Sequence, residues 1–335
     1  MIKIDKGGDL RKILLDYDTI LFDFMGVISN GSGSIDGASD IMKFLKQNNK
    51  IVSFVSNAPV KSINFQKHLS LVYNIEKNTH YDFTVTSGDV SADILKEKLL
   101  KSQDGKEYKN CYIFGKIQYD EFLQSISYNI VDNLDDADFI YVAYPQLNLE
   151  EYDNIDVKYK QFLVESSMYD EKYFDSTNIE LFMDKIKLFK KYNLPMFSDC
   201  QDLVAMQKDK NSQKLNYVIR QGSITAEYKK LGGEVIDISK PSSVIYDYTF
   251  KKIKSNLGVD IDGKKILMIG DTIDTDVFGA YNATKDLGVS VDAMLTLCGV
   301  AGKFFGKDVD RIEKYVEERG ISLKYVIDGV WVIGV

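Results

Sequence analysis

Four polar residues at the ends of apolar runs could together carry out chemistry. Asp23, Ser56 and Asp271 each end or directly follow such a run, and Lys240 precedes a proline and a helical pattern. An aspartate nucleophile and a second acid can bind a hard cation such as Mg²⁺, which prefers oxygen ligands. A serine hydroxyl and a lysine can hold the other oxygens of a phosphoryl group. The residue types therefore indicate a site for phosphoryl transfer.

The elements that must position these side chains are predicted strands. Four apolar runs rich in β-branched and aromatic residues cover 19–24, 50–57, 265–271 and 291–297. After the first run, one stripe of residues has the spacing of an amphipathic helix: Ala38, Ile41, Met42 and Leu45. Strands that alternate with helices favour a doubly wound parallel sheet, whose ligands bind at the carboxyl ends of the strands. We therefore expect Asp23, Ser56 and Asp271 to lie together at one edge.

The spacing between the runs indicates a second domain inserted into the first. Ser56 follows Asp23 by 33 residues, close to the roughly 30 residues of one strand–helix–strand step. Lys240 follows Ser56 by 184 residues, which is too many for one crossover. Further strand-like runs fill that gap, at 110–115, 138–145, 194–199, 214–222 and 233–239. We predict an α/β core over 1–84 and 238–335 and an inserted α/β domain over 85–237, with a peripheral elaboration at 147–180.

Composition excludes several classes of function. The 335 residues are 44% hydrophobic and 27% charged, and their net charge of −8 argues against a nucleic-acid partner. Three cysteines without paired spacing indicate a reducing compartment, with neither disulfides nor a zinc cluster. Two histidines leave little scope for a histidine base. Charges interrupt the N-terminal apolar runs, so we expect a cytoplasmic protein with no membrane partner.

Four motifs, in their order and surroundings, resemble the haloacid dehalogenase (HAD) superfamily of phosphohydrolases: DFMGV (23–27), SN (56–57), KP (240–241) and GDTIDTD (270–276). The chain is most similar to the subclass with a large α/β cap inserted after the second motif, the NagD and p-nitrophenyl phosphatase-like proteins, and above all to its uncharacterised members. Three further segments agree with that subclass: IDGA (35–38), QGSITAEYKKLGGEVIDISKP (221–241) and LTLCGV (295–300). The resemblance implies a Rossmann-like core with a cap over its site.

The resemblance also implies catalytic and phosphate-binding roles. Asp23 is the expected nucleophile, which would accept the phosphoryl group as an aspartyl phosphate. Ser56 and the backbone amide of Asn57 are expected to bind phosphoryl oxygens. Lys240 is expected to pair with Asp23 and the phosphate, keeping the carboxylate ionised. In the cap, two residues of the return segment are candidates for substrate contact: Gly222 and Ser223.

The cofactor implied by the resemblance is Mg²⁺. Its expected protein ligands are Asp23, Asp271 and the backbone carbonyl of Met25, with Asp276 close to the metal and its waters. Asp274 is a candidate for capping a helix that begins near Ile273, and we assign it no catalytic role.

Met25 departs from the family pattern. The family's phosphatases have an acid two residues after the nucleophile, which protonates the leaving oxygen and later deprotonates the attacking water. Methionine can do neither, and a positioned acid–base group contributes about 10²–10⁴-fold to the rate. The expected activity is therefore that of a hydrolase of small phosphorylated metabolites that is slow, or restricted to good leaving groups.

A protein from another functional class is the alternative. A catalytically weak or inactive HAD-like protein could retain the pocket as a ligand-binding or protein-interaction module. The segment 147–180, rich in tyrosines and acids, is a candidate for such a contact or for a homodimer contact through the cap.

Overall fold

The chain divides into two compact units. In the computed structural model, the described residues are 2–4, 7–31, 33–97, 100–102, 105–115, 126–145, 176–208 and 215–328. The first unit comprises Met1–Ser56, Lys61–Thr86 and Ser239–Val335, and the second comprises Asn57–Val60 and Ser87–Ile238. The elaboration predicted at 147–180 lies outside the described residues as far as residue 175.

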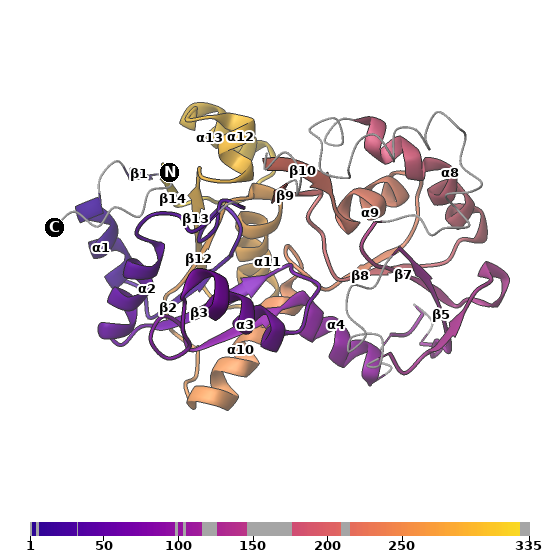
Figure 1. The fold of residues 1–335 in the computed structure, drawn as a ribbon, viewed down its shortest axis with the longest axis horizontal. Helices are drawn as coiled ribbons and strands as arrows, with labels where there is room; N and C mark the ends of the chain where they lie inside the picture. Colours follow the sequence, from indigo (N-terminus) through magenta and orange to yellow (C-terminus); the bar gives the residue numbers. More distant parts are fainter. Residues whose placement is uncertain are drawn as a thin grey trace. The chain divides into compact units, whose positions relative to one another are not determined.

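Parallel strands form the sheet of the first unit: β1 (Ile2–Ile4), β2 (Thr19–Phe22), β3 (Ile51–Ser56), β4 (Phe83–Thr86), β12 (Ile266–Gly270), β13 (Val291–Thr296) and β14 (Tyr325–Ile327). Their order across the sheet is β1-β14-β13-β12-β2-β3-β4 (Figure 1). The chain runs from β2 toward one edge and from β12 toward the other, as in a doubly wound sheet. The predicted parallel α/β fold is confirmed.

Local sequence signals explain where the helices of this unit begin and end. The helical elements are α1 (Gly7–Leu15), α2 (Ala38–Gln47), α3 (Ser62–Tyr73), α10 (Ser243–Leu257), the π-helical turn η3 (Ile273–Val277), α11 (Phe278–Leu287), α12 (Val300–Phe305) and α13 (Val309–Glu318). The predicted stripe of α2 is buried: Ala38, Ile41, Met42 and Leu45. Before α10, the Ser242 hydroxyl accepts a hydrogen bond from the Val244 amide, and Gly258 ends the helix in a left-handed conformation.

The second unit contains a parallel sheet of its own, in the order β11-β8-β7-β5-β6. These strands are β5 (Asn110–Phe114), β6 (Asn129–Val131), β7 (Phe139–Val142), β8 (Met196–Ser198) and β11 (Val235–Asp237). The helical elements are α4 (Ser87–Lys96), the 3₁₀ turn η1 (Leu134–Asp136), α8 (Ser176–Tyr192) and α9 (Gln221–Lys230). Phe114, Ile186, Phe189 and Tyr228 are among the buried residues that pack α8 and α9 on the sheet.

One strand of the second unit differs from its predicted setting. The run at 214–222 forms β10 (Leu215–Ile219), which pairs antiparallel with β9 (Val204–Lys208) in a separate two-stranded sheet. Gln221 and Gly222 already belong to α9. The strand-like run predicts an extended segment correctly, but such a run does not specify the partner strand.

Asp199, which follows β8 directly, is a wholly buried acid of the second unit. The Tyr141 hydroxyl donates to its Oδ2 at 2.5 Å, and the Gln221 amide nitrogen donates to its Oδ1 at 3.3 Å. Burial is the main reason that the pKa of Asp199 is raised, to about 6. The folded unit therefore favours the neutral carboxylic acid.

Asp199→Asn should remove a pH dependence of stability. In the unfolded chain this acid ionises with the ordinary aspartate pKa of 3.8, whereas in the folded unit it keeps its proton up to about pH 6. Folding of the wild type should therefore lose about 3 kcal/mol as the pH rises from 4 to above 6. Urea unfolding across this range should show a smaller loss in the variant. An equal loss in both proteins would contradict the prediction, and Asp135→Asn, an exposed acid of η1, is the control.

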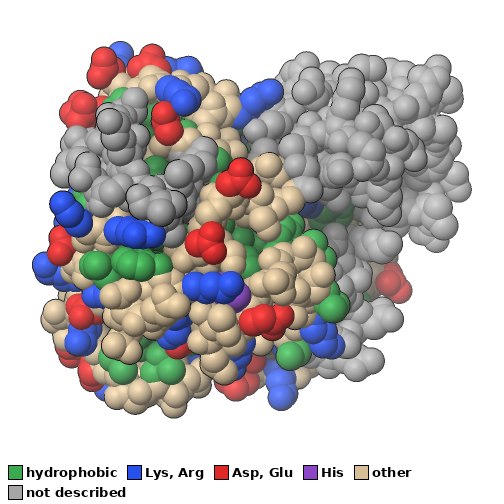
Figure 2. All heavy atoms as spheres, turned by 60° about the vertical axis from the view of Figure 1, so that its left-hand side comes forward, with side chains coloured by type: hydrophobic (Ala, Val, Ile, Leu, Met, Phe, Trp, Pro, Cys, Tyr) green, Lys and Arg blue, Asp and Glu red, His purple; other side chains and the backbone are tan. Residues whose placement is uncertain are grey.

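Charged side chains of both signs are interspersed on the face of the described structure that Figure 2 displays. Neither sign dominates that face. Among the helices that the structure describes, none combines the length and the apolar character needed to cross a membrane.

Candidate active site

The predicted site residues of the first unit meet at one edge of its sheet. β2 lies between β3 and β12, and all three strands are parallel. Asp23 directly follows β2, Ser56 is the last residue of β3, and Asp271 directly follows β12. The Asp23 amide also donates to the Ile269 carbonyl of β12, at 2.8 Å, which continues the pairing up to the acid.

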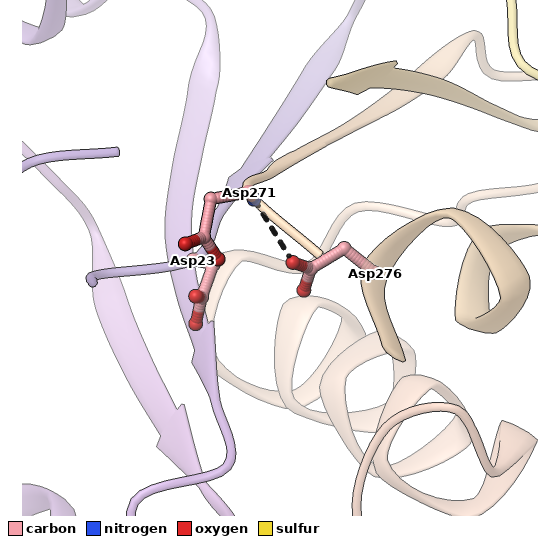
Figure 3. A group of neighbouring side chains, drawn as sticks. All are labelled: Asp23, Asp271 and Asp276. Carbon is pink, nitrogen blue, oxygen red and sulfur yellow. Dashed lines mark hydrogen bonds between the residues drawn. The ribbon is translucent and has the colours of Figure 1, made fainter. Parts of the chain in front are cut away.

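Three carboxylates from two loops form an acidic cluster. One oxygen each of Asp23, Asp271 and Asp276 lies within 4.8 Å of the others (Figure 3). Burial, followed by the charges of Asp23 and Asp276, raises the pKa of Asp271 well above its usual range. A divalent cation among these oxygens would offset that repulsion, and Mg²⁺ and Ca²⁺ both accept an all-oxygen donor set. The cluster therefore fits the metal expected from the sequence.

Asp271 is fixed by backbone and side-chain donors. The Val300 amide donates to its Oδ2 at 2.7 Å, and the Thr272 hydroxyl donates to its Oδ1 at 3.0 Å. A Cβ atom at Gly26 or Gly299 would overlap the Asp271 carboxylate. The two glycines therefore leave the space in which this acid lies.

Asp276 is held against the start of its own loop. Its Oδ2 accepts hydrogen bonds from the amides of Asp271 and Thr272, both at 3.1 Å (Figure 3 draws the first). A Cβ atom at Gly270 would overlap the Asp276 carboxylate. This arrangement leaves Oδ1 of Asp276 directed toward Lys240.

Lys240 is a buried cation between two acids. Its Nζ donates to Oδ1 of Asp23 at 2.8 Å and to Oδ1 of Asp276 at 2.7 Å, and only 1% of its side chain is exposed. Lys240 therefore contacts Asp23, the partner expected from the family resemblance, although 217 positions separate the two residues. The positive charge favours the ionised form of the Asp23 carboxylate.

Lys240→Met should strongly destabilise the first unit, because the change leaves Asp23 and Asp276 without their shared cation. Removing one partner of a buried ion pair typically costs about 3–5 kcal/mol. Chemical unfolding without added metal should show a loss of that order. The matched control is Lys254→Met, which breaks an exposed pair with Asp260 and should change the midpoint little.

Met25 lies in a tight turn after Asp23. The turn is closed by a hydrogen bond from the Ile28 amide to the Phe24 carbonyl, at 2.9 Å. The buried hydroxyl of Thr296, from the end of β13, donates to the Gly26 carbonyl at 2.7 Å. The sequence predictions did not include Thr296, because a threonine at a strand end has no local signal that identifies a partner 270 positions away.

The remaining predicted residues belong to the second unit. The Asn57 side-chain amide donates to Oδ1 of Asp202 at 2.9 Å. Gly222 leaves no room for a Cβ atom beside the Gln201 carbonyl, and the Ser223 hydroxyl donates to the Leu203 carbonyl at 2.6 Å. The contacts described for these residues are thus within their own unit. Their phosphate and substrate contacts stay predictions.

The predicted capping role of Asp274 is wrong. The residue before η3 is Thr272, which makes no side-chain cap, and the amides at the start of this loop are bound by Asp276 instead. Asp274 accepts hydrogen bonds from Tyr315 of α13 and from Arg319, which directly follows that helix. The Asp274 carboxylate is therefore directed to the neighbouring α13 segment and not to the amides of its own turn.

A doubly wound α/β core with an acidic cluster at the carboxyl ends of its strands defines a Rossmann-like α/β fold. Two family models match the chain, one for haloacid dehalogenase-like hydrolases over residues 20–129 and one described as HAD-hydrolase-like over residues 237–290. Over these residues the chain is similar to the haloacid dehalogenase-like hydrolases. Comparison with curated proteins gave no match.

Solved structures share the fold at low sequence identity. A possible sugar phosphatase from Cytophaga hutchinsonii has a TM-score of 0.64 and 17% identity, over 99% of each chain. A p-nitrophenyl phosphatase from Archaeoglobus fulgidus has a TM-score of 0.56 and 20% identity, over 94% of this chain and 97% of the other. A glycerol phosphate phosphatase from Mycobacterium tuberculosis, in complex with calcium, has a TM-score of 0.51 and 17% identity, over 86% and 68%.

Proposed function

We propose that this protein is a Mg²⁺-dependent phosphatase of small phosphorylated metabolites that acts through an aspartyl phosphate on Asp23. The observation that carries the proposal is the contact of Asp23 with Lys240 beside Asp271 and Asp276. The names of the similar structures, a sugar, a nitrophenyl and a glycerol phosphate phosphatase, support it. The calcium complex of the last one supports a divalent cofactor.

In this mechanism, Asp23 attacks the phosphorus atom and the ester oxygen leaves with its electron pair. Lys240 keeps the Asp23 carboxylate ionised and offsets negative charge as it develops. Ser56, the last residue of β3, binds a phosphoryl oxygen through its hydroxyl. A water molecule then attacks the phosphorus of the aspartyl phosphate and releases inorganic phosphate, which restores the carboxylate.

The residues that would hold Mg²⁺ are Asp23, Asp271 and the backbone carbonyl of Met25, with Asp276 near the ion. When bound, the cation supplies positive charge to the phosphoryl oxygens and relieves the repulsion among the acids. The replacement of an acid by Met25 does not affect this role, because a backbone carbonyl is present whatever the side chain.

Met25 sets the substrate preference that we propose. With no acid at this position to protonate the departing oxygen, the rate should depend on how stable the leaving group is as an anion. Acyl phosphates and aryl phosphates should therefore be hydrolysed faster than alkyl phosphates of sugars or glycerol.

Incubation with Mg²⁺ and a panel of acyl, aryl and alkyl phosphates tests the proposal. We expect phosphate release that requires Mg²⁺ and follows the order of leaving-group stability. A beryllofluoride adduct on Asp23 should form in parallel, because this probe imitates the phosphoryl group on the carboxylate. The proposal would be overturned if the protein hydrolysed none of these phosphates and formed no beryllofluoride adduct.

A non-catalytic ligand-binding protein is the second candidate, and the methionine at position 25 favours it. Such a protein would bind Mg²⁺ and phosphate at the same acids without turning substrates over. An adduct with beryllofluoride but no hydrolysis of any phosphate in the panel would favour this candidate.

A further inference from the structure

Asp274 lies two residues before Asp276 and binds α13 instead of the acidic cluster. The Tyr315 hydroxyl donates to its Oδ2 at 2.8 Å, and Nε of Arg319 donates to its Oδ1 at 3.1 Å. The Arg319 guanidinium also stacks on the Tyr315 ring, 3.3 Å from its centroid. Each carboxylate oxygen of Asp274 thus accepts a hydrogen bond, one from Tyr315 and one from Arg319, and these two side chains also stack on each other.

The turn that carries Asp274 also carries the site. η3 is a single π-helical turn, a form that is rare and often found at functional sites. Side-chain contacts join this turn to residues outside it. Asp276 makes such contacts toward Lys240, and Asp274 makes them toward α13.

The segment that supplies these contacts holds the same loop at a second place. At the start of α12, the Val300 amide binds the Asp271 carboxylate and the Ala301 amide binds the Asp271 carbonyl, at 2.9 Å. Helix α13, which follows α12, is anchored in the core by the buried side chains of Ile312 and Val316. The loop from Asp271 to Asp276 is thus held by this segment near both of its ends.

We propose that Tyr315 and Arg319 are positioning residues for the metal site. They act through Asp274, fixing η3 so that the carboxylates of Asp271 and Asp276 keep the separation that a divalent cation needs. An exposed ion pair adds little to global stability, and the side chains of Asp274 and Arg319 are 46% and 37% exposed. The ion pair between Asp274 and Arg319 should therefore act mainly on the geometry of the loop from Asp271 to Asp276. The inference rests on the proposed function, since it concerns the same metal site.

The test is calorimetric titration of the full chain with Mg²⁺ alone. We expect the Tyr315→Phe/Arg319→Gln double variant to bind Mg²⁺ about tenfold more weakly or worse, the usual effect of losing a partner that orients metal ligands. Tyr315→Phe keeps the aromatic ring and should show a smaller change in the same direction. Hydrogen exchange of the amides from 271 to 277 should be faster in the double variant.

The matched control is Lys324→Gln. Lys324 also pairs with a partly exposed aspartate, Asp292, and lies over the Tyr17 ring, but Asp292 is at the amino end of β13, away from the acidic cluster. The control should lose similar thermal stability and keep the wild-type Mg²⁺ affinity. Wild-type affinity in the double variant would overturn the inference alone. If the wild type does not bind Mg²⁺, the metal site of the proposed function is overturned as well.

Discussion

Asp23→Asn should lower phosphate release by about 10³-fold or more, the scale of loss expected when a covalent nucleophile is removed. An amide is a poor nucleophile toward phosphorus, and the change also removes the charge that Lys240 binds at 2.8 Å. Initial rates with Mg²⁺ and an aryl phosphate measure the loss. The beryllofluoride adduct should disappear in the same variant.

The control for this experiment is Asp292→Asn, which changes an acid at the opposite end of the same sheet. It should keep the wild-type rate. Circular dichroism and thermal unfolding of both variants establish that the fold is intact. Turnover in Asp23→Asn equal to that of the wild type would mean that hydrolysis uses another nucleophile or comes from a contaminating enzyme.

Met25→Asp should raise the rate on alkyl phosphates by about 10²–10⁴-fold, the usual contribution of a positioned acid–base group. Residue 25 lies in the turn closed by Phe24 and Ile28, and it is partly exposed, so a carboxylate there can reach solvent. The gain should be smaller on aryl and acyl phosphates, because their leaving groups need no proton. Comparison of kcat/KM across leaving groups measures this difference.

Met25→Asn is the matched control, because asparagine has nearly the size of aspartate but cannot transfer a proton. Its rates should stay near those of the wild type. An equal gain in the two variants would mean that polarity at this position matters and acid–base chemistry does not. No gain in Met25→Asp would mean that another group already supplies the proton.

Much of the fold of the first unit could be predicted because its signals are local. The stripe of α2 follows helical spacing, and the apolar runs that end in Asp23, Ser56 and Asp271 mark buried parallel strands. Parallel pairing then brings the ends of neighbouring strands together, so proximity at the sheet edge follows from topology. The contact of Lys240 with Asp23 is implied by the family resemblance.

Other contacts could not be predicted, because they join residues with no shared local pattern. Tyr315 and Arg319 reach Asp274 from 41 and 45 positions away, and a polar side chain on a helix surface has many potential partners. β9 and β10 form an antiparallel pair of their own, and an apolar run does not specify which strand it will pair with. The sequence favours Asp274 as a cap because acids are common at helix starts, but its carboxylate binds Tyr315 and Arg319 instead.

The glycines around the acids determine where this protein can acquire a new activity. Gly26, Gly270 and Gly299 each lack the space for one further carbon atom, because a carboxylate fills it. Even alanine at these positions would displace Asp271 or Asp276. Residue 25, by contrast, is partly exposed. A directed-evolution library for new substrates should therefore vary position 25 and leave the three glycines unchanged.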